Sequence, residues 1–193
     1  VPNSALRFKP PEGAIVRVAE VAANNGTPAA NDLTIDQVPG FSASPDSSRA
    51  LHLVVLLGYE GERALAVYDN LQPIQTTLFV GSPAFRPEWE GRTEEFNATL
   101  INKIGTEAVR KIDTLDPDAI CRTLREYLGN ISTRRENAFV ICPLGTKPQA
   151  LGVFQFLREV RDTPALIYAS PLRHNQNFYS YGIGSTWTLL EPS

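Results

Sequence analysis

The sequence has few of the residues that build metal sites and disulfide scaffolds. Its 193 residues include two histidines and two cysteines, Cys121 and Cys142. Both cysteines fall inside segments whose patterns predict a helix and a strand, so we interpret them as buried thiols in a reducing compartment. The small number of nitrogen and sulfur ligands and the lack of a closely spaced cysteine pair argue against a zinc site. We therefore expect no metal and no bound cofactor.

Long apolar runs and an excess of positive charge are also missing. No run approaches the roughly 20 residues that a membrane helix needs, and the first residues lack the basic and apolar regions of a secretion signal. We therefore expect a cytoplasmic protein with no membrane partner. The net charge of -3 and the pI near 5.5 argue against binding to duplex nucleic acid, because proteins of that class carry a basic face.

Three widespread catalytic and nucleotide-binding motifs are absent. The turn at Gly145 lacks the first glycine and the trailing hydroxyl of a P-loop. The run G-Y-E-G-E-R that starts at Gly58 is not the dinucleotide fingerprint G-x-G-x-x-G. Ser82 and Ser180 lack the G-x-S-x-G elbow, which argues against an α/β-hydrolase triad. No motif in the chain supplies a nucleophile.

What the sequence does contain is a regular alternation of apolar runs and amphipathic segments. Continuous apolar strands are typical of a sheet covered on both faces, and their alternation with helices indicates βαβ units. We predict an α/β fold, a Rossmann-like three-layer sandwich with about five strands in a mostly parallel sheet. The predicted strands are residues 51–57, 76–80, 109–112, 138–142 and 165–169, and the predicted helices are residues 62–70, 89–104, a segment starting at 116–117 and a segment ending near 160.

The two ends of the chain depart from this alternation. Residues 1–50 are rich in proline, glycine and small polar residues, so we predict an N-terminal arm or extension, with a strand at 14–18, before a domain at 51–193. Residues 184–190 form a predicted strand that follows the fifth strand without an intervening helix. A parallel partner would need a crossover, so we expect this last strand to lie antiparallel at an edge of the sheet.

Residues 138–149 hold the clearest candidate for ligand binding. The segment A-F-V-I-C-P-L-G-T-K-P-Q reads as a buried strand, a turn of small residues and a helix start. Thr146 suits the N-cap, and Pro148 suits the first turn. Lys147 would then lie at the positive end of the helix dipole, where an anion would stabilise it. The alternative is an ordinary strand–helix junction with a solvated lysine.

Basic and aromatic residues follow several of the predicted strands. Ligands of open parallel sheets bind beyond the carboxyl ends of the strands, and guanidinium groups with aromatic rings suit a phosphate and a base. The alternative is that glutamates in the same loops neutralise these charges. We also predict that residues 173–181 form a lid or a subunit contact. The predicted ligand-binding residues are Gly58, Tyr59, Arg63, Ser82, Arg86, Arg92, Gly145, Thr146, Lys147, Arg173, His174 and Tyr179.

Candidates for catalysis are fewer. Glu60 and His174 could act as acid or base on a phosphorylated or nucleotide substrate. A glutamate beside Arg63 is more often half of a surface ion pair. His52 lies within an apolar strand, so we interpret it as a buried, hydrogen-bonded histidine and not as a ligand.

The G-T-K-P turn at Gly145, with the order of elements over residues 51–190, resembles the CRISPR-associated Rossmann-fold (CARF) sensor domains. The resemblance implies a homodimer that binds a cyclic oligonucleotide second messenger in antiviral defence. In some such domains the ring is also cleaved, so the alternative is a Rossmann-like enzyme, a hydrolase or ring nuclease. This chain departs from the family pattern in its single glycine before Thr146, its long 173–181 loop and its N-terminal extension. An interaction scaffold without a small ligand is a third possibility.

Overall fold

The computed structural model describes residues 15–19, 33–41, 49–130, 137–160, 164–171 and 186–190. The predicted lid at residues 173–181 therefore lies outside the described residues, together with Arg173, His174, Tyr179 and Ser180. Side chains are described for 33–41, 49–129, 138–160 and 164–171.

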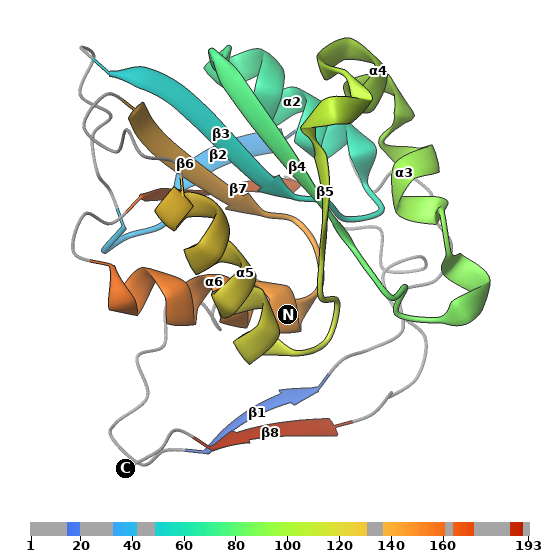
Figure 1. The fold of residues 1–193 in the computed structure, drawn as a ribbon, viewed down its shortest axis with the longest axis vertical. Helices are drawn as coiled ribbons and strands as arrows, with labels where there is room; N and C mark the ends of the chain where they lie inside the picture. The colour runs from blue at the N-terminus through green and yellow to red at the C-terminus, as the bar shows by residue number, and fades with distance from the viewer. Residues whose placement is uncertain are drawn as a thin grey trace.

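A six-stranded sheet forms the centre of the fold (Figure 1). Five of its strands run parallel, and one edge strand runs antiparallel to its neighbour, which confirms the predicted α/β fold. The strand order is β2-β7-β6-β3-β4-β5, where the strands are β2 (Leu33–Gln37), β3 (Ala50–Leu56), β4 (Gln75–Gly81), β5 (Val109–Ile112), β6 (Asn137–Pro143) and β7 (Ala165–Pro171).

The antiparallel edge strand is not the predicted one. β8 (Thr186–Leu190) is antiparallel, as expected for a strand without a crossover, but it pairs with β1 (Ile15–Ala19) in a separate two-stranded sheet. The position beside β7 is taken by β2, which pairs with it from Leu33 opposite Pro171 to Gln37 opposite Ile167. β2 comes from the segment assigned to the N-terminal arm. The domain boundary at residue 50 stays a prediction.

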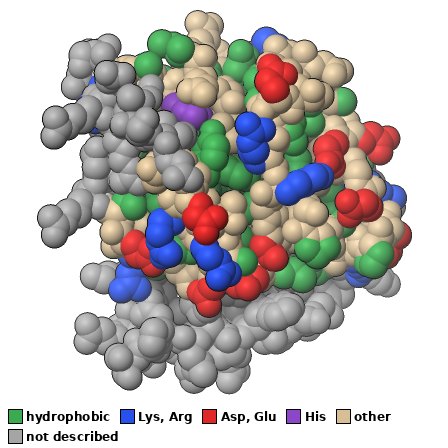
Figure 2. Space-filling model, viewed as in Figure 1, with side chains coloured by type: hydrophobic (Ala, Val, Ile, Leu, Met, Phe, Trp, Pro, Cys, Tyr) green, Lys and Arg blue, Asp and Glu red, His purple; other side chains and the backbone are tan. Residues whose placement is uncertain are grey.

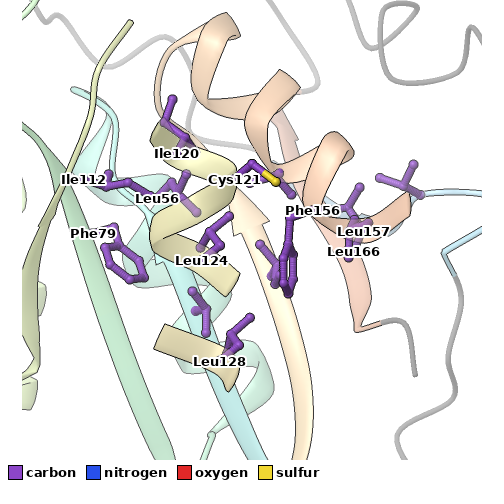
Figure 3. Close-up of a cluster of buried hydrophobic side chains, with 14 residues drawn as sticks. Leu56, Phe79, Ile112, Ile120, Cys121, Leu124, Leu128, Phe156, Leu157 and Leu166 are labelled. Carbon is purple, nitrogen blue, oxygen red and sulfur yellow. The ribbon is translucent and has the colours of Figure 1, made fainter. Parts of the chain in front are cut away.

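Helices cover both faces of the sheet, because the strands are apolar on both faces. On one face, Leu53 and Val55 pack with residues of α2 (Gly61–Leu71) and α4 (Ala98–Ile104). On the other, Val54 and Leu56 pack against α5 (Pro117–Asn130) and α6 (Lys147–Glu159), whose Leu124 and Phe156 point into the same cluster (Figure 3). The fold is thus a three-layer sandwich with one apolar core on each face.

The predicted helix 89–104 is broken into three pieces. They are the 3-10 helix η1 (Pro87–Trp89), α3 (Arg92–Phe96) and α4, and a second 3-10 helix, η2 (Thr106–Ala108), follows. The break lies at Asn97, whose side chain is 1% exposed and donates to the carbonyls of Gly58 and Thr93, each at 2.8 Å. In one continuous helix over residues 89–104, Phe96 would share a face with the buried residues Leu100 and Ile101. In the broken helix, Phe96 is instead 39% exposed.

His52 is fully buried and hydrogen-bonded, as predicted. Its Nε2 lies 3.1 Å from Oγ1 of Thr77, which in turn lies 2.5 Å from the Tyr127 hydroxyl. The ring also packs against Phe139, with centroids 5.0 Å apart. Burial lowers the pKa of His52 to about 4, because the charged imidazolium is poorly solvated inside the sheet. The histidine is therefore neutral in the folded protein near pH 7.

Acidic and basic side chains are interspersed over the face viewed in Figure 2, and no broad patch of one sign is visible there. Several charged side chains of the described residues are paired, as Lys103 is with Asp69 at 2.6 Å. Among the residues whose structure is described, no helix has both the length and the apolar character needed to traverse a bilayer.

Candidate functional site

The sheet changes direction between β3 and β6. From β3 the chain moves outward to β4 and β5, and then returns to β6 on the other side of β3. The loops after β3 and β6 therefore leave the carboxyl edge in opposite directions, which is where open α/β sheets place their ligands. The turn after β3 holds Gly58, Tyr59 and Glu60, and the turn after β6 holds Leu144, Gly145 and Thr146.

The two turns at this point are closely packed against each other. The amide of Leu144 donates to the carbonyl of Leu56 at 2.9 Å. A Cβ added to Gly58 would lie 2.1 Å from the Leu144 carbonyl oxygen, and one added to Gly145 would lie 1.8 Å from Oε1 of Gln149. Both predicted glycines are thus required by contacts within the protein. Their contact with a ligand stays a prediction.

The start of α6 is closed by a capping box. Oγ1 of Thr146 accepts from the Gln149 amide at 3.3 Å, and the Thr146 amide donates to Oε1 of Gln149 at 2.9 Å. Thr146 is the N-cap, as predicted, and Lys147 is the first helical residue, with an exposed side chain. Because its amide and hydroxyl are already bonded, Thr146 has little left to offer an anion. Lys147 contributes an exposed cationic side chain at this helix end.

Hydrogen bonds join this helix start to two other turns at the same edge. Oγ1 of Thr146 donates to the Thr114 carbonyl at 2.6 Å, and Nε2 of Gln149 donates to the Asp113 carbonyl at 3.0 Å. The hydroxyl of Thr114 donates to the carbonyl of Pro83, in the turn after β4, at 2.5 Å. Gln149 was not among the predicted site residues. The spacing T-x-x-Q from Thr146 to Gln149 is a capping-box signature from which it could have been found.

Arg63 and Glu60 form an ion pair within the first turn of α2. Nε of Arg63 lies 2.5 Å from Oε2 of Glu60, and their side chains are 10% and 29% exposed. The guanidinium carbon also lies 6.0 Å from the centre of the Tyr168 ring on β7. The predicted pair is therefore present, but it is largely buried and not on the surface. Neither group is well placed to give up its partner for a ligand.

Four aromatic rings gather beside the turns after β3 and β4. This aromatic cluster consists of Tyr59, Phe85, Trp89 and Phe96, all at least partly exposed. The Trp89 centroid lies 5.5 Å from that of Tyr59 and 6.0 Å from that of Phe85, with which it is stacked. The guanidinium carbon of Arg86 lies 5.0 Å from the Trp89 ring centre, a cation–π distance. Arg86 also faces Glu88 at 3.9 Å, a long and solvent-exposed pairing.

The structure brings some predicted residues together and separates others. Tyr59 and Arg86 both contact Trp89. Ser82 lies in the same β4 turn and donates its amide to the Ile112 carbonyl at 2.8 Å, and Arg92 begins α3. Arg63 is held apart by Glu60. The predicted set did not include Phe85, Trp89 and Phe96. Glutamates are interspersed among these aromatic residues in the sequence, so the pattern does not predict that the rings lie together.

The cysteines offer no reactive thiolate. Burial raises the pKa of Cys142 to about 12 and also raises the pKa of Cys121. Both thiols are free and buried, as predicted. Within the described part of the chain, no three histidine, cysteine, aspartate or glutamate side chains gather where they could hold a metal ion.

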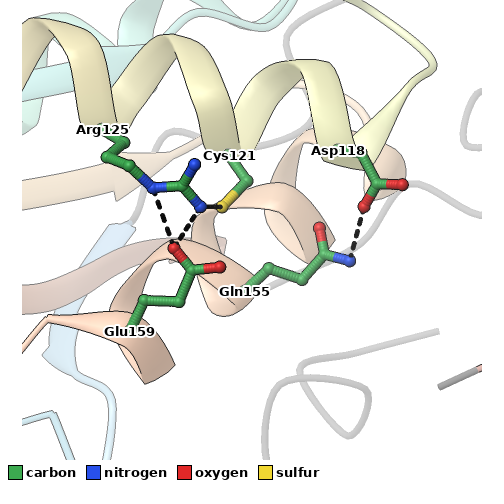
Figure 4. Close-up of polar contacts among 5 residues, drawn as sticks. All are labelled: Asp118, Cys121, Arg125, Gln155 and Glu159. Atoms are coloured by element: carbon green, nitrogen blue, oxygen red, sulfur yellow. Dashed lines mark hydrogen bonds and ion pairs between the residues drawn. The ribbon is translucent and has the colours of Figure 1, made fainter. Parts of the chain in front are cut away.

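The polar groups near Cys121 join α5 to α6 (Figure 4). Nε of Arg125 donates to Oε2 of Glu159 at 3.0 Å, and Nε2 of Gln155 donates to Oδ1 of Asp118 at 3.1 Å. These contacts hold the two helices together on the outer surface. Because these polar groups are paired between the helices, we take the aromatic cluster and the start of α6 as the candidate site.

No protein-family model and no curated protein matches this chain. Of the expected likeness to CARF sensors, the structure supports only the Rossmann-like α/β fold with a mostly parallel sheet. No family is assigned.

Proposed function

We propose that the protein binds a nucleotide second messenger, with a base against the aromatic cluster and phosphate at Arg86 and Lys147. The observation that supports this most is the pairing of a guanidinium with a ring at the carboxyl edge of the sheet. Arg86 over Trp89 presents a cation and an aromatic face side by side, which are the two chemistries that a nucleotide requires.

The charges of the site favour Arg86 over Arg63 as a phosphate ligand. Arg86 has a side chain that is 47% exposed, and its pairing with Glu88 spans 3.9 Å. An exposed pair of this kind contributes about 0–1 kcal/mol, so a phosphate can displace the glutamate at little cost. Arg63 would have to leave a shorter, more buried partner. Lys147 supplies a second cation on the same edge, and Arg92 is a third candidate.

Binding fits the described residues better than catalysis does. The carboxylate of Glu60 is held by Arg63, and neither thiol is reactive. The alternative, a hydrolase or ring nuclease, would have to rely on His174 as its acid or base. A sensor needs only a ligand and a surface that responds to it, so we favour a cytoplasmic sensor over an enzyme.

A homodimer would extend the site to a cyclic oligonucleotide. Each protomer carries one aromatic cluster, so two copies would offer a stacking surface to bases on opposite sides of a ring. This part of the proposal rests on the resemblance to CARF domains and on the shared fold. Duplex nucleic acid and membranes are not proposed partners.

A thermal-shift screen of mononucleotides, cyclic dinucleotides and cyclic oligonucleotides tests the proposal, followed by calorimetry on any hit. A true ligand at a hundredfold excess over its dissociation constant stabilises the protein by about 2.7 kcal/mol. Arg86→Ala should weaken that binding by roughly 1–3 kcal/mol, the range for a lost charge-assisted hydrogen bond. Arg122→Ala, an exposed arginine on α5, serves as the matched control. If no nucleotide stabilises the protein, the proposal is wrong.

A further inference from the structure

We propose that Gln149 and Thr114 are positioning residues of this site: they lock the turns after β4, β5 and β6 into one unit that holds Lys147 and Arg86 at a fixed separation. The ligand part of this inference rests on the proposed nucleotide site. The mechanical part, the coupling between the turns, stands on the hydrogen bonds alone.

The bonds form a continuous chain across the carboxyl edge. Starting after β4, the Pro83 carbonyl accepts from the Thr114 hydroxyl, and the Thr114 carbonyl accepts from the Thr146 hydroxyl. Gln149 then bonds Thr146 through its Oε1 and the Asp113 carbonyl through its Nε2. Three turns that are far apart in the sequence are thereby connected through side chains.

These hydrogen bonds connect the turns after β5 and β6, two strands that are not neighbours in the sheet. β5 and β6 are separated in the sheet by β3 and β4, so the turn after β5 reaches α6 by passing over the ends of the strands between them. A Cβ on Gly81, the last residue of β4, would lie 2.5 Å from Oγ1 of Thr114 and 3.1 Å from Nε2 of Gln149. The end of β4 is thus fitted against both side chains.

Burial makes these hydrogen bonds costly to break. Gln149 is 1% exposed and Thr114 is 4% exposed. Inside a region of low dielectric, a polar group that loses its partner pays the full cost of desolvation, so a displaced turn would leave several groups unsatisfied at once. The three turns therefore move together or not at all.

Both proposed cations lie close in sequence to members of this unit. Lys147 lies between the two members of the capping box, Thr146 and Gln149. Arg86 and the ring of Phe85 follow Pro83 by a few residues. A site whose cations are held before the ligand arrives avoids the entropic cost of ordering them on binding.

Two substitutions separate the positioning role from a merely structural one. Gln149→Glu keeps a residue that completes a capping box, so α6 is retained, but it removes the donor to the Asp113 carbonyl. Thr114→Val keeps the shape of the side chain and removes the donor to the Pro83 carbonyl. Thr114→Ser restores the hydroxyl and is the conservative rescue.

The readouts are the exposure of Trp89 and the affinity for adenosine 5′-monophosphate. In a Trp187→Phe background Trp89 is the remaining tryptophan, so acrylamide quenching reports on the β4 turn. We expect Gln149→Glu and Thr114→Val to increase quenching and to weaken nucleotide binding about tenfold, as for one lost buried hydrogen bond, with circular dichroism unchanged. Thr114→Ser should return both values to those of the parent.

The outcomes distinguish the two proposals. Increased quenching in Thr114→Val that Thr114→Ser reverses supports the positioning role, even if the parent binds no nucleotide, a result that overturns only the proposed function. Unchanged quenching in folded Thr114→Val overturns the positioning role, whatever the nucleotide does. If Gln149→Glu fails to fold, the comparison of valine with serine at position 114 decides.

Discussion

At the scale of single residues, the same side chain types serve opposite purposes at this edge of the sheet. Arg63 is buried and held by Glu60, whereas Arg86 is half exposed and lies on a ring. The Thr146 hydroxyl is hydrogen-bonded to the Thr114 carbonyl, whereas the side chain of Lys147 beside it is exposed. Residue type alone could not separate these cases, because the difference lies in which neighbour each side chain meets.

Lys147→Ala should leave folding nearly intact and weaken nucleotide binding. An exposed lysine at a helix start changes the stability by about 0.5 kcal/mol at most, and removing its side chain leaves the capping box of Thr146 and Gln149 intact. The affinity for an anionic ligand should fall by roughly 1–3 kcal/mol. Calorimetry and urea unfolding measure the two quantities. A variant that unfolds while keeping its affinity per folded molecule would mean that Lys147 is structural.

His52 should make the protein less stable in mild acid. The pKa of His52 is about 4 in the folded protein and near 6.5 in the unfolded chain. Between these pH values the imidazole is protonated in the unfolded chain and neutral in the folded protein. Its contribution is fully present above pH 6.5 and is lost as the pH falls toward 4, by about 1.4 kcal/mol per pH unit within that window.

Urea unfolding of the parent and of His52→Asn at pH 7 and pH 4.5 measures this contribution. The parent should lose roughly 2–3 kcal/mol more than the variant between the two pH values. Carboxylates that titrate in the same range contribute equally to both proteins and cancel. Equal losses of unfolding free energy in the parent and the variant would show that the folded protein does not lower the pKa of His52.

At the scale of elements, backbone contacts between turns matter as much as helix and strand preferences. Gly58 and Leu144 meet where the two halves of the sheet diverge, and Asn97 breaks a helix in order to bond the carbonyl of Gly58. The apolar periodicity of residues 89–104 predicts one helix, because periodicity carries no information about a hydrogen bond to a distant turn. The T-x-x-Q spacing, by contrast, is local, and it is sufficient to place the start of α6.

Two glycine-to-alanine substitutions should change stability in opposite directions. Gly58→Ala places a methyl group 2.1 Å from the Leu144 carbonyl oxygen, so the turns must separate, at a cost of about 1–3 kcal/mol. Gly129→Ala, in α5 with open space around its Cβ, should stabilise the protein by about 0.5–1 kcal/mol through helix propensity. Thermal unfolding of both variants tests this. A neutral Gly58→Ala would mean that the two turns are not in firm contact.

At the scale of the whole molecule, the sequence predicts the layers well and the edges poorly. β3, β4, β6 and β7 are recognisable because each is apolar on both faces, which follows from being covered by helices on both sides. β2 is short and only partly buried, so its pattern resembles that of a loop. The predicted site residues Ser82, Gly145 and Thr146 lie in turns at the carboxyl edge of the sheet. The aromatic cluster depends on how the chain folds after β4. That path is set by contacts between turns, which a linear pattern does not contain.

The composition of β5 also limits how this protein can self-associate. β5 is the last strand of the sheet, four residues long, with Arg110 and Lys111 exposed along it. A second copy that added its own β5 to this edge would have to accommodate Arg110 and the Lys111–Glu94 ion pair of both strands, and it would gain only a few backbone bonds in return. Growth of the sheet into a ribbon of stacked copies, the first step toward aggregation, is therefore discouraged at this side by charge and by length.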